Sequence, residues 1–157
     1  MDEIKNTYLT FNVGSNHFGI HVESIVEIIE YAEPKSQSSM LSYMKGLVDH
    51  RGEIVPLVDT GLKFGLDPVA ITDQTCSIIV SIDGAEKKFN VALIVDAVTE
   101  VVEVDEASRQ YIETSYKPGY VQFAAKINDD FIMFIDANKV FTDSEVISLQ
   151  KITEKQA

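Results

Sequence analysis

Hydrophobic and polar residues alternate over short stretches along much of this chain, which is the pattern of half-buried β-strands. Residues 8–13 and 18–22 alternate in this way around a group of turn-forming residues. The arrangement returns at 77–82 and 88–95, where Asp83-Gly84 is a strong hairpin signal. No regular succession of strand, helix and strand is present, so the pattern predicts a mainly β fold and disfavours a Rossmann-type fold.

A strand buried on both faces is predicted at Glu53–Val58, where nearly every residue from Ile54 onward is apolar. Before it, Arg51-Gly52 predicts a tight turn, because glycine readily adopts a positive φ. After it, Asp59 is expected to cap a short helical turn over Thr60–Phe64.

Two longer helical segments are also predicted. Residues 36–45 carry apolar side chains at helical spacing behind a serine cluster, and Gly46 is expected to end this helix. A C-terminal helix is expected at 143–155, because Thr142 and Glu145 form a capping box before an apolar stripe.

Two stretches of sequence recur without a gap. Residues 18–30 align on 91–103 at an offset of 73, and residues 53–59 align on 130–136 at an offset of 77. A half of roughly 65 residues is marginal alone, so we expect two similar β-barrels of about five strands each that share a core. The expected boundaries are one domain at 1–157, with halves at 8–66 and 75–141.

The composition of the chain limits the partners and the cellular compartment that we expect. The 157 residues are 45% hydrophobic, which supports a packed core, and 25 acidic residues against 13 basic ones give a net charge of −12. Nucleic acid and anionic membrane surfaces attract cationic proteins, so neither is an expected partner. The single Cys76 excludes an intrachain disulfide, and neither a signal-peptide pattern nor a bilayer-length apolar run is present. We therefore expect a cytoplasmic protein.

Val58-Asp59-Thr60-Gly61 resembles the signature of aspartic proteases. That chemistry requires two carboxylates that share one proton, so a single copy needs a homodimer or a second motif. The repeat places Asp136 at the equivalent position, but Ala137-Asn138 follow it. A helix cap explains both aspartates equally well, and a homodimeric hydrolase that uses Asp59 is kept as the alternative hypothesis.

Other catalytic or metal-binding candidates are weak. His17 and His21 lie about 13 Å apart if the segment is a strand, and His50 has no evident Cys or His partner. Cys76 has no basic neighbour in sequence and is interpreted as a small buried residue. Phosphate-binding and nucleophile-elbow motifs are absent from the sequence, so we expect a protein that is not an enzyme and uses no metal or cofactor.

Acidic residues recur along 24–31, which we predict to be a strand although its isoleucine spacing would also suit a helix. The simplest interpretation is a solvated strand face. The functional interpretation is an acidic rim around an apolar groove, beside Arg51 on its tight turn. The residues proposed to form the groove are Ile25, Ile28, Val98 and Val101.

Several short motifs together match a known family: Phe18-Gly19-Ile20, Lys45-Gly46-Leu47, Arg51-Gly52, Phe64-Gly65 and the late Phe131–Asp136. Through these motifs, nearly the whole chain resembles the CheW family of chemosensory coupling proteins. The resemblance implies two intertwined five-stranded SH3-like β-barrels with short helices and a C-terminal helix. It also implies a non-catalytic adaptor that joins the cytoplasmic tip of chemoreceptors to the regulatory domain of the histidine kinase CheA.

By position, the resemblance places a set of residues at the receptor contact: Ile25, Glu27, Arg51, Val98 and Val101. Gly46 and Gly52 fall where a glycine affects partner binding or only makes a turn. Asp49-His50 stands where the family usually has Asn-Leu, and Asp59-Thr60-Gly61 stands where it usually has Asp-Leu-Arg. The first departure bears on the receptor-side contact and on the choice of receptor. An adaptor in a chemosensory pathway other than chemotaxis is kept as a further hypothesis.

Overall fold

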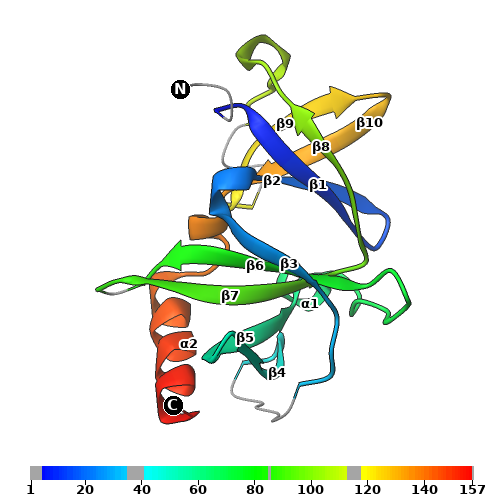
Figure 1. Cartoon of the computed structure of the whole chain (residues 1–157). Helices are drawn as coiled ribbons and strands as arrows, with labels where there is room; N and C mark the ends of the chain where they lie inside the picture. The colour runs from blue at the N-terminus through cyan, green and yellow to red at the C-terminus, as the bar shows by residue number, and fades with distance from the viewer. Residues whose placement is uncertain (1–4, 35–40, 85, 113–117, 157) are drawn as a thin grey trace.

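Two five-stranded β-sheets make up most of the structure, a computed structural model that describes residues 5–34, 41–84, 86–112 and 118–156 (Figure 1). The first sheet has the strand order β8-β1-β2-β10-β9, and the second sheet has the order β3-β6-β7-β5-β4. The strands of the two sheets, in chain order, are β1 Thr7–Val13, β2 Asn16–His21, β3 Ile25–Glu30, β4 Met44–His50, β5 Glu53–Asp59, β6 Cys76–Asp83, β7 Lys88–Val95, β8 Ala97–Glu103, β9 Val121–Ile127 and β10 Asp130–Ile135. The prediction of a mainly β fold is confirmed.

Each sheet takes strands from both halves of the chain. The hairpin β1–β2 lies between β8 and the hairpin β9–β10, whereas the hairpin β6–β7 lies between β3 and the hairpin β4–β5. The two halves are therefore intertwined (Figure 1). Closed barrels are not confirmed, because within the described residues no strand pairing joins the two edge strands of either sheet.

The internal repeat is reproduced in the strand register. Val26 is left unpaired between two paired neighbours in β3, and Thr99 is left unpaired in the same way in β8, at the repeat offset of 73. The parallel pairs also correspond, since Leu57 lies opposite Ala92 and Phe134 lies opposite Gly19. Matching bulges and matching parallel pairs mean that both sheets follow one backbone plan.

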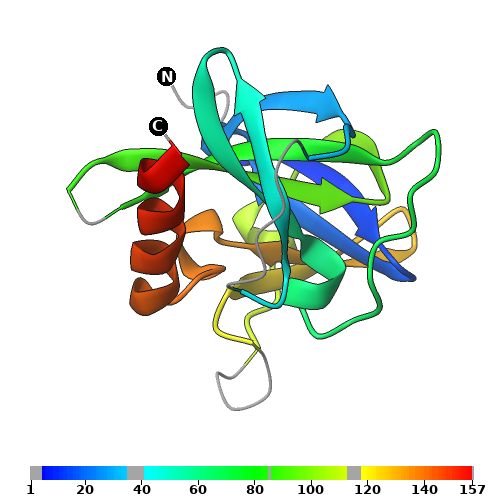
Figure 2. The same ribbon diagram turned by 90° about the horizontal axis from the view of Figure 1, so that it is seen from below.

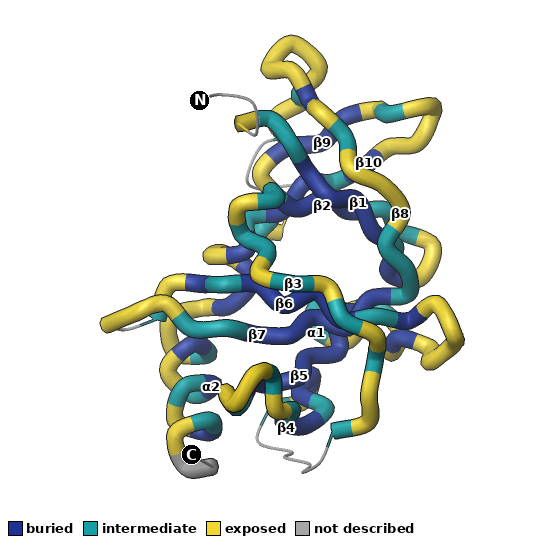
Figure 3. Tube along the Cα trace, in the orientation of Figure 1, coloured by how far each residue is buried: buried dark blue, intermediate teal, exposed yellow. Residues whose placement is uncertain are grey.

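The core joins the two sheets. One continuous cluster of buried side chains includes Phe11 and Ile20 from the first sheet and Leu57 and Leu93 from the second. A smaller cluster lies within the first sheet around the stacked rings of Phe123 and Phe134, with Tyr8 set edge-on to both. The shared core agrees with the expectation that neither half buries enough surface alone. Figure 3 shows the buried β1, β2 and β5 beside the alternating exposure of β3.

The central buried strand is confirmed. Every residue of β5 from Val55 to Asp59 is buried. Asp59 caps the short helix α1, Thr60–Lys63, by accepting a hydrogen bond from the backbone N–H of Leu62 at 3.1 Å. Gly65, with φ 76°, follows the helix.

The helix predicted at 36–45 is wrong over its described part. Met44 and Lys45 belong to β4, and residues 35–40 lie outside the described residues. Gly46 therefore does not end a helix but lies inside β4, next to a register shift. Apolar spacing misled the prediction here because Met44 is buried as the first residue of β4, where it pairs with Val58, and not on the face of a helix.

A C-terminal helix, α2 Asp143–Gln156, packs beside the second sheet next to β5 (Figure 2). The capping box is present, since the Thr142 N–H donates to Glu145 Oε1 at 2.8 Å and the Glu145 N–H donates to Thr142 Oγ1 at 3.2 Å. The Tyr43 hydroxyl donates to Glu145 Oε2 at 2.5 Å, which ties the start of the helix to the chain just before β4.

Candidate protein-binding surface

Three polar side chains meet between opposite edges of the second sheet. Glu27 lies on the edge strand β3, whereas His50 and Arg51 lie at the end of the other edge strand, β4, and in the turn that follows it. Glu27 Oε1 lies 2.9 Å from His50 Nε2 and 3.0 Å from Arg51 Nε. We call these three residues the edge cluster; it connects two strands that no backbone pairing joins within the described chain.

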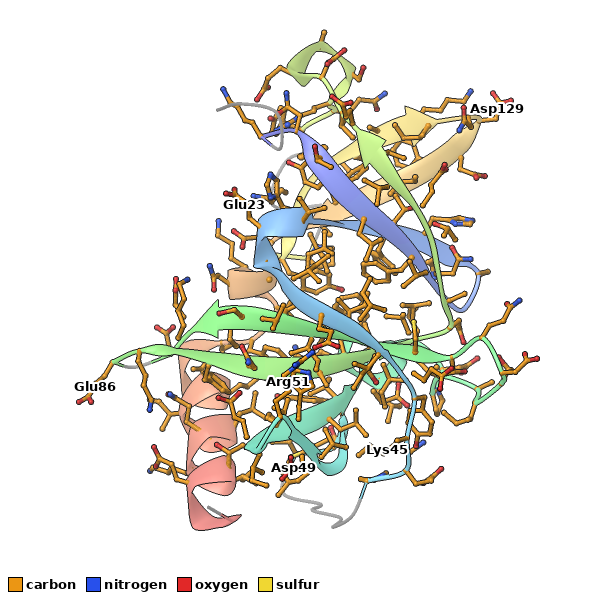
Figure 4. The ribbon with its side chains drawn as sticks, viewed as in Figure 1. Glu23, Lys45, Asp49, Arg51, Glu86 and Asp129 are labelled. Carbon is orange, nitrogen blue, oxygen red and sulfur yellow. The ribbon has the colours of Figure 1, made fainter. Side chains whose placement is uncertain are left out.

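Exposure differs across the edge cluster. The side chain of His50 is 11% exposed, that of Glu27 is 34% exposed and that of Arg51 is 75% exposed. The imidazole is thus nearly enclosed, while most of the guanidinium faces solvent. Figure 4 labels Arg51 and Asp49 on the β4–β5 hairpin, below β3.

Their mutual interaction favours the charged forms of Glu27 and Arg51, the two more exposed residues of the edge cluster. Hydrogen bonds from Arg51 and then from His50 lower the pKa of Glu27 from its ordinary value. The hydrogen bond and the charge of the Glu27 carboxylate raise the pKa of Arg51. The surface therefore presents a charged guanidinium beside a charged carboxylate in a protein whose net charge is −12.

The turn that carries Arg51 has the predicted geometry. Arg51 has φ 53° and Gly52 has φ 82°, which is the left-handed pair of a type I′ hairpin turn. Asp49 Oδ1 accepts a hydrogen bond from the Gly52 N–H at 3.0 Å. Gly52 is accounted for by its conformation, and a role of Gly46 or Gly52 in partner binding stays a prediction.

Two predicted contact residues are less exposed than a binding role suggests. Ile25 and Val98 are half-buried and pack against the main core. Val26 and Ile28 on β3 and Val101 on β8 are instead exposed, at 48%, 42% and 60%. The groove predicted between Ile25, Ile28, Val98 and Val101 stays a prediction.

His50 has a partner that was not predicted. The sequence shows no Cys or His partner for a metal site, and the structure places His50 on Glu27, 23 residues earlier in the chain. Only the three-dimensional approach of two sheet edges brings these residues together, and no spacing in the sequence indicates it.

The carboxylate of Asp59 accepts hydrogen bonds from backbone N–H groups. Besides Leu62, the buried Val69 N–H donates to both carboxylate oxygens of Asp59 at 3.2 Å. Asp136 accepts in a similar way from the Asn138 N–H at 2.9 Å. Each aspartate therefore caps the segment after a buried strand, and the two strands belong to different sheets.

The described residues hold no group of three or more His, Cys, Asp or Glu side chains that could bind a metal ion. In the same part of the chain, no helix is both long and apolar enough to cross a membrane. Burial raises the pKa of the Cys76 thiol, which keeps it in the poorly nucleophilic protonated form.

By fold, this is a mainly β protein built of two intertwined five-stranded sheets. Residues 7–145 match the model of the CheW-like domain, and the chain belongs to this family. The CheW family consists of non-catalytic scaffolds in chemotaxis signalling, in which they couple receptors to the kinase CheA.

Individual relatives agree with the family. The chain is 23% identical over 140 residues to a probable chemotaxis protein CheW of Rhizobium etli, covering 87% of this chain and 88% of that protein. It is 24% identical over 135 residues to the chemotaxis protein CheW of Bacillus subtilis, covering 84% of each. The crystal structure of the scaffolding protein TtCheW from Thermoanaerobacter tengcongensis is similar with a TM-score of 0.75 at 25% identity, covering 87% of this chain and 88% of that one.

Proposed function

We propose that this protein is a cytoplasmic, non-catalytic adaptor that couples chemoreceptors to the histidine kinase CheA in chemotaxis. The match of residues 7–145 to the CheW-like domain, together with the similar fold of a CheW scaffold, carries this proposal. Its contribution to signalling is geometric: it holds receptor and kinase in one assembly, where small receptor movements bias kinase activity.

The proposed receptor contact consists of Ile25, Glu27, Arg51, Val98 and Val101. The apolar members would take the apolar face of a helix at the receptor tip. The Arg51 Nε–H donates a hydrogen bond to Glu27, and within the described residues the two Nη atoms of Arg51 have no hydrogen-bond partner. A guanidinium held at one nitrogen can donate from the remaining N–H groups to a carboxylate or a helix-end carbonyl of the receptor. Glu27 and Arg51 would thus set the register of the bound helix.

The proposed kinase contact is a sheet edge that packs against the homologous regulatory domain of CheA. Each sheet offers edge strands, β8 and β9 in the first and β3 and β4 in the second. Since the proposed receptor contact includes Val98 and Val101 on β8, a receptor bound there would leave the β9 edge of the first sheet free for the kinase.

The experiment is a pull-down with a receptor cytoplasmic fragment. Arg51→Ala should bind several-fold less receptor while its melting temperature stays nearly unchanged, because the side chain is 75% exposed. Lys88→Ala is the matched control, since Lys88 is a 67% exposed cation paired with Asp83 at 2.9 Å on another hairpin of the same sheet. Equal binding by wild type and Arg51→Ala would remove Arg51 from the receptor contact.

A second candidate is an adaptor of the same family in a chemosensory pathway other than chemotaxis. Asp49 and His50, which depart from the usual family residues, both act at the proposed receptor surface, since Asp49 fixes the turn and His50 holds Glu27. Mass spectrometry of the receptors captured from lysate by the wild type would distinguish the two pathways.

A further inference from the structure

The duplication supplies an internal control for the edge cluster. At the repeat offsets, Arg51 and Gly52 correspond to Asn128 and Asp129, which have φ 50° and 71°. The hairpin turn of the first sheet thus has two left-handed residues at the same positions as the turn that carries Arg51. Figure 4 shows Asp129 at the upper tip of the molecule, well away from Arg51.

The side chains at the two turns differ. Glu27, His50 and Arg51 correspond at these offsets to Glu100, Ile127 and Asn128. Ile127 packs against the smaller apolar cluster of the first sheet. The same bulge, strand pairing and turn therefore form in the first sheet without an edge cluster, so the backbone plan does not require one.

The turn of the second sheet is also less favourable for its residue. Asparagine tolerates the left-handed conformation better than arginine does, because its short side chain bonds to the local backbone. The first sheet has asparagine at this position, and the second sheet has arginine. A strained residue that another copy of the same turn avoids indicates a requirement beyond folding.

We propose that His50 is a positioning residue of the partner-binding surface, and this inference rests on the proposed function. A carboxylate oxygen only accepts hydrogen bonds, so the imidazole must carry a proton on Nε2 and donate it to Glu27 Oε1 across 2.9 Å. The nearly enclosed ring fixes the carboxylate, and the same oxygen accepts from Arg51 Nε at 3.0 Å. His50 thereby sets the direction in which Arg51 presents its remaining N–H groups, without touching the partner itself.

Two variants separate positioning from packing. His50→Leu keeps a side chain of similar size but removes the donor, whereas His50→Gln supplies an N–H donor near the position of Nε2. His17→Leu is the control, because His17 lies on β2 in the first sheet, whereas the edge cluster lies on the second sheet.

The first readout uses the free protein and does not depend on any partner. Long-range ¹H–¹⁵N spectra should show the Nε2–H form of the His50 ring in the wild type. The Arg51 Nε–H should exchange with water slowly in the wild type and His50→Gln, and faster in His50→Leu. An Nδ1–H form in the wild type, or the same Arg51 exchange in His50→Leu, would overturn the inference.

The second readout is affinity for the receptor fragment. We expect binding to weaken roughly three- to tenfold in His50→Leu, to recover in His50→Gln and to be unchanged in His17→Leu. Equal affinity of His50→Leu and wild type would overturn the role in binding. If the wild type binds no receptor fragment, the proposed function fails, and the exchange measurement still decides whether His50 positions Arg51.

Discussion

Replacing Asp59 by alanine removes both oxygens that receive the backbone N–H groups of Leu62 and Val69. Replacing Asp136 removes the acceptor for one N–H, that of Asn138. The repeat makes the two aspartates equivalent in position, so the pair of variants compares a cap that also serves a buried loop with a simple cap.

The magnitude follows from the bonds. Loss of a helix cap costs about 1 kcal/mol. The Val69 N–H, in a residue only 7% exposed, would then be left without its acceptor, which costs about 1–3 kcal/mol more. Asp59→Ala should therefore destabilise by about 2–4 kcal/mol and Asp136→Ala by about 1 kcal/mol. For a chain of this size, these values correspond to melting temperatures lower by roughly 4–16 °C and 2–4 °C.

Urea unfolding of wild type, Asp59→Ala, Asp59→Asn and Asp136→Ala measures the difference directly. Asp59→Asn keeps one side-chain oxygen and should retain part of the stability. The structural role of Asp59 would be refuted if Asp59→Ala cost no more than Asp136→Ala. A wild-type peptidase activity that Asp59→Ala abolishes would revive the hydrolase hypothesis.

Two further predictions concern stability. Burial alone would raise the pKa of Glu145, but hydrogen bonds from Thr142 and Tyr43 and the charge of Lys63 lower this pKa overall. The ionised Glu145 carboxylate therefore stabilises the fold above the unfolded-state pKa, and this stabilisation is lost as the pH falls through the folded-state pKa. Glu145→Gln should thus be less stable than wild type at neutral pH and approach it in urea titrations near pH 3. Gly19→Ala should destabilise by about 1–3 kcal/mol because its Cβ would overlap the Phe134 ring, as thermal unfolding would show; a wild-type melting temperature would contradict this packing.

The sequence predicted the repeat and the turns because both depend on local chemistry. Arg51-Gly52 indicated a left-handed turn, and the two aspartates after apolar strands indicated caps, and all are present. The offsets of 73 and 77 also match the bulges and parallel pairs. The repeat itself is visible in the sequence, whereas the bulges and the parallel pairs that follow it appear only in the structure.

Other features depended on contacts between distant segments. The segment before β4 has apolar residues that suit a helix, and the hydrogen bond from the Asp59 N–H to the Tyr43 carbonyl instead begins the strand pairing with β5. The meeting of Glu27 with His50 depends on how the second sheet bends its edges together, which no local pattern encodes.

Coupling of receptor to kinase can be measured by co-sedimentation. Receptor-containing membranes are mixed with CheA in the presence or absence of this protein, and the kinase in the pellet is measured along with its autophosphorylation rate. We expect CheA to sediment with the receptors and to respond to receptor ligand only when wild-type protein is present, and less so with Arg51→Ala. Kinase that sediments and responds equally without the protein, or never with it, would show that the protein does not couple the two.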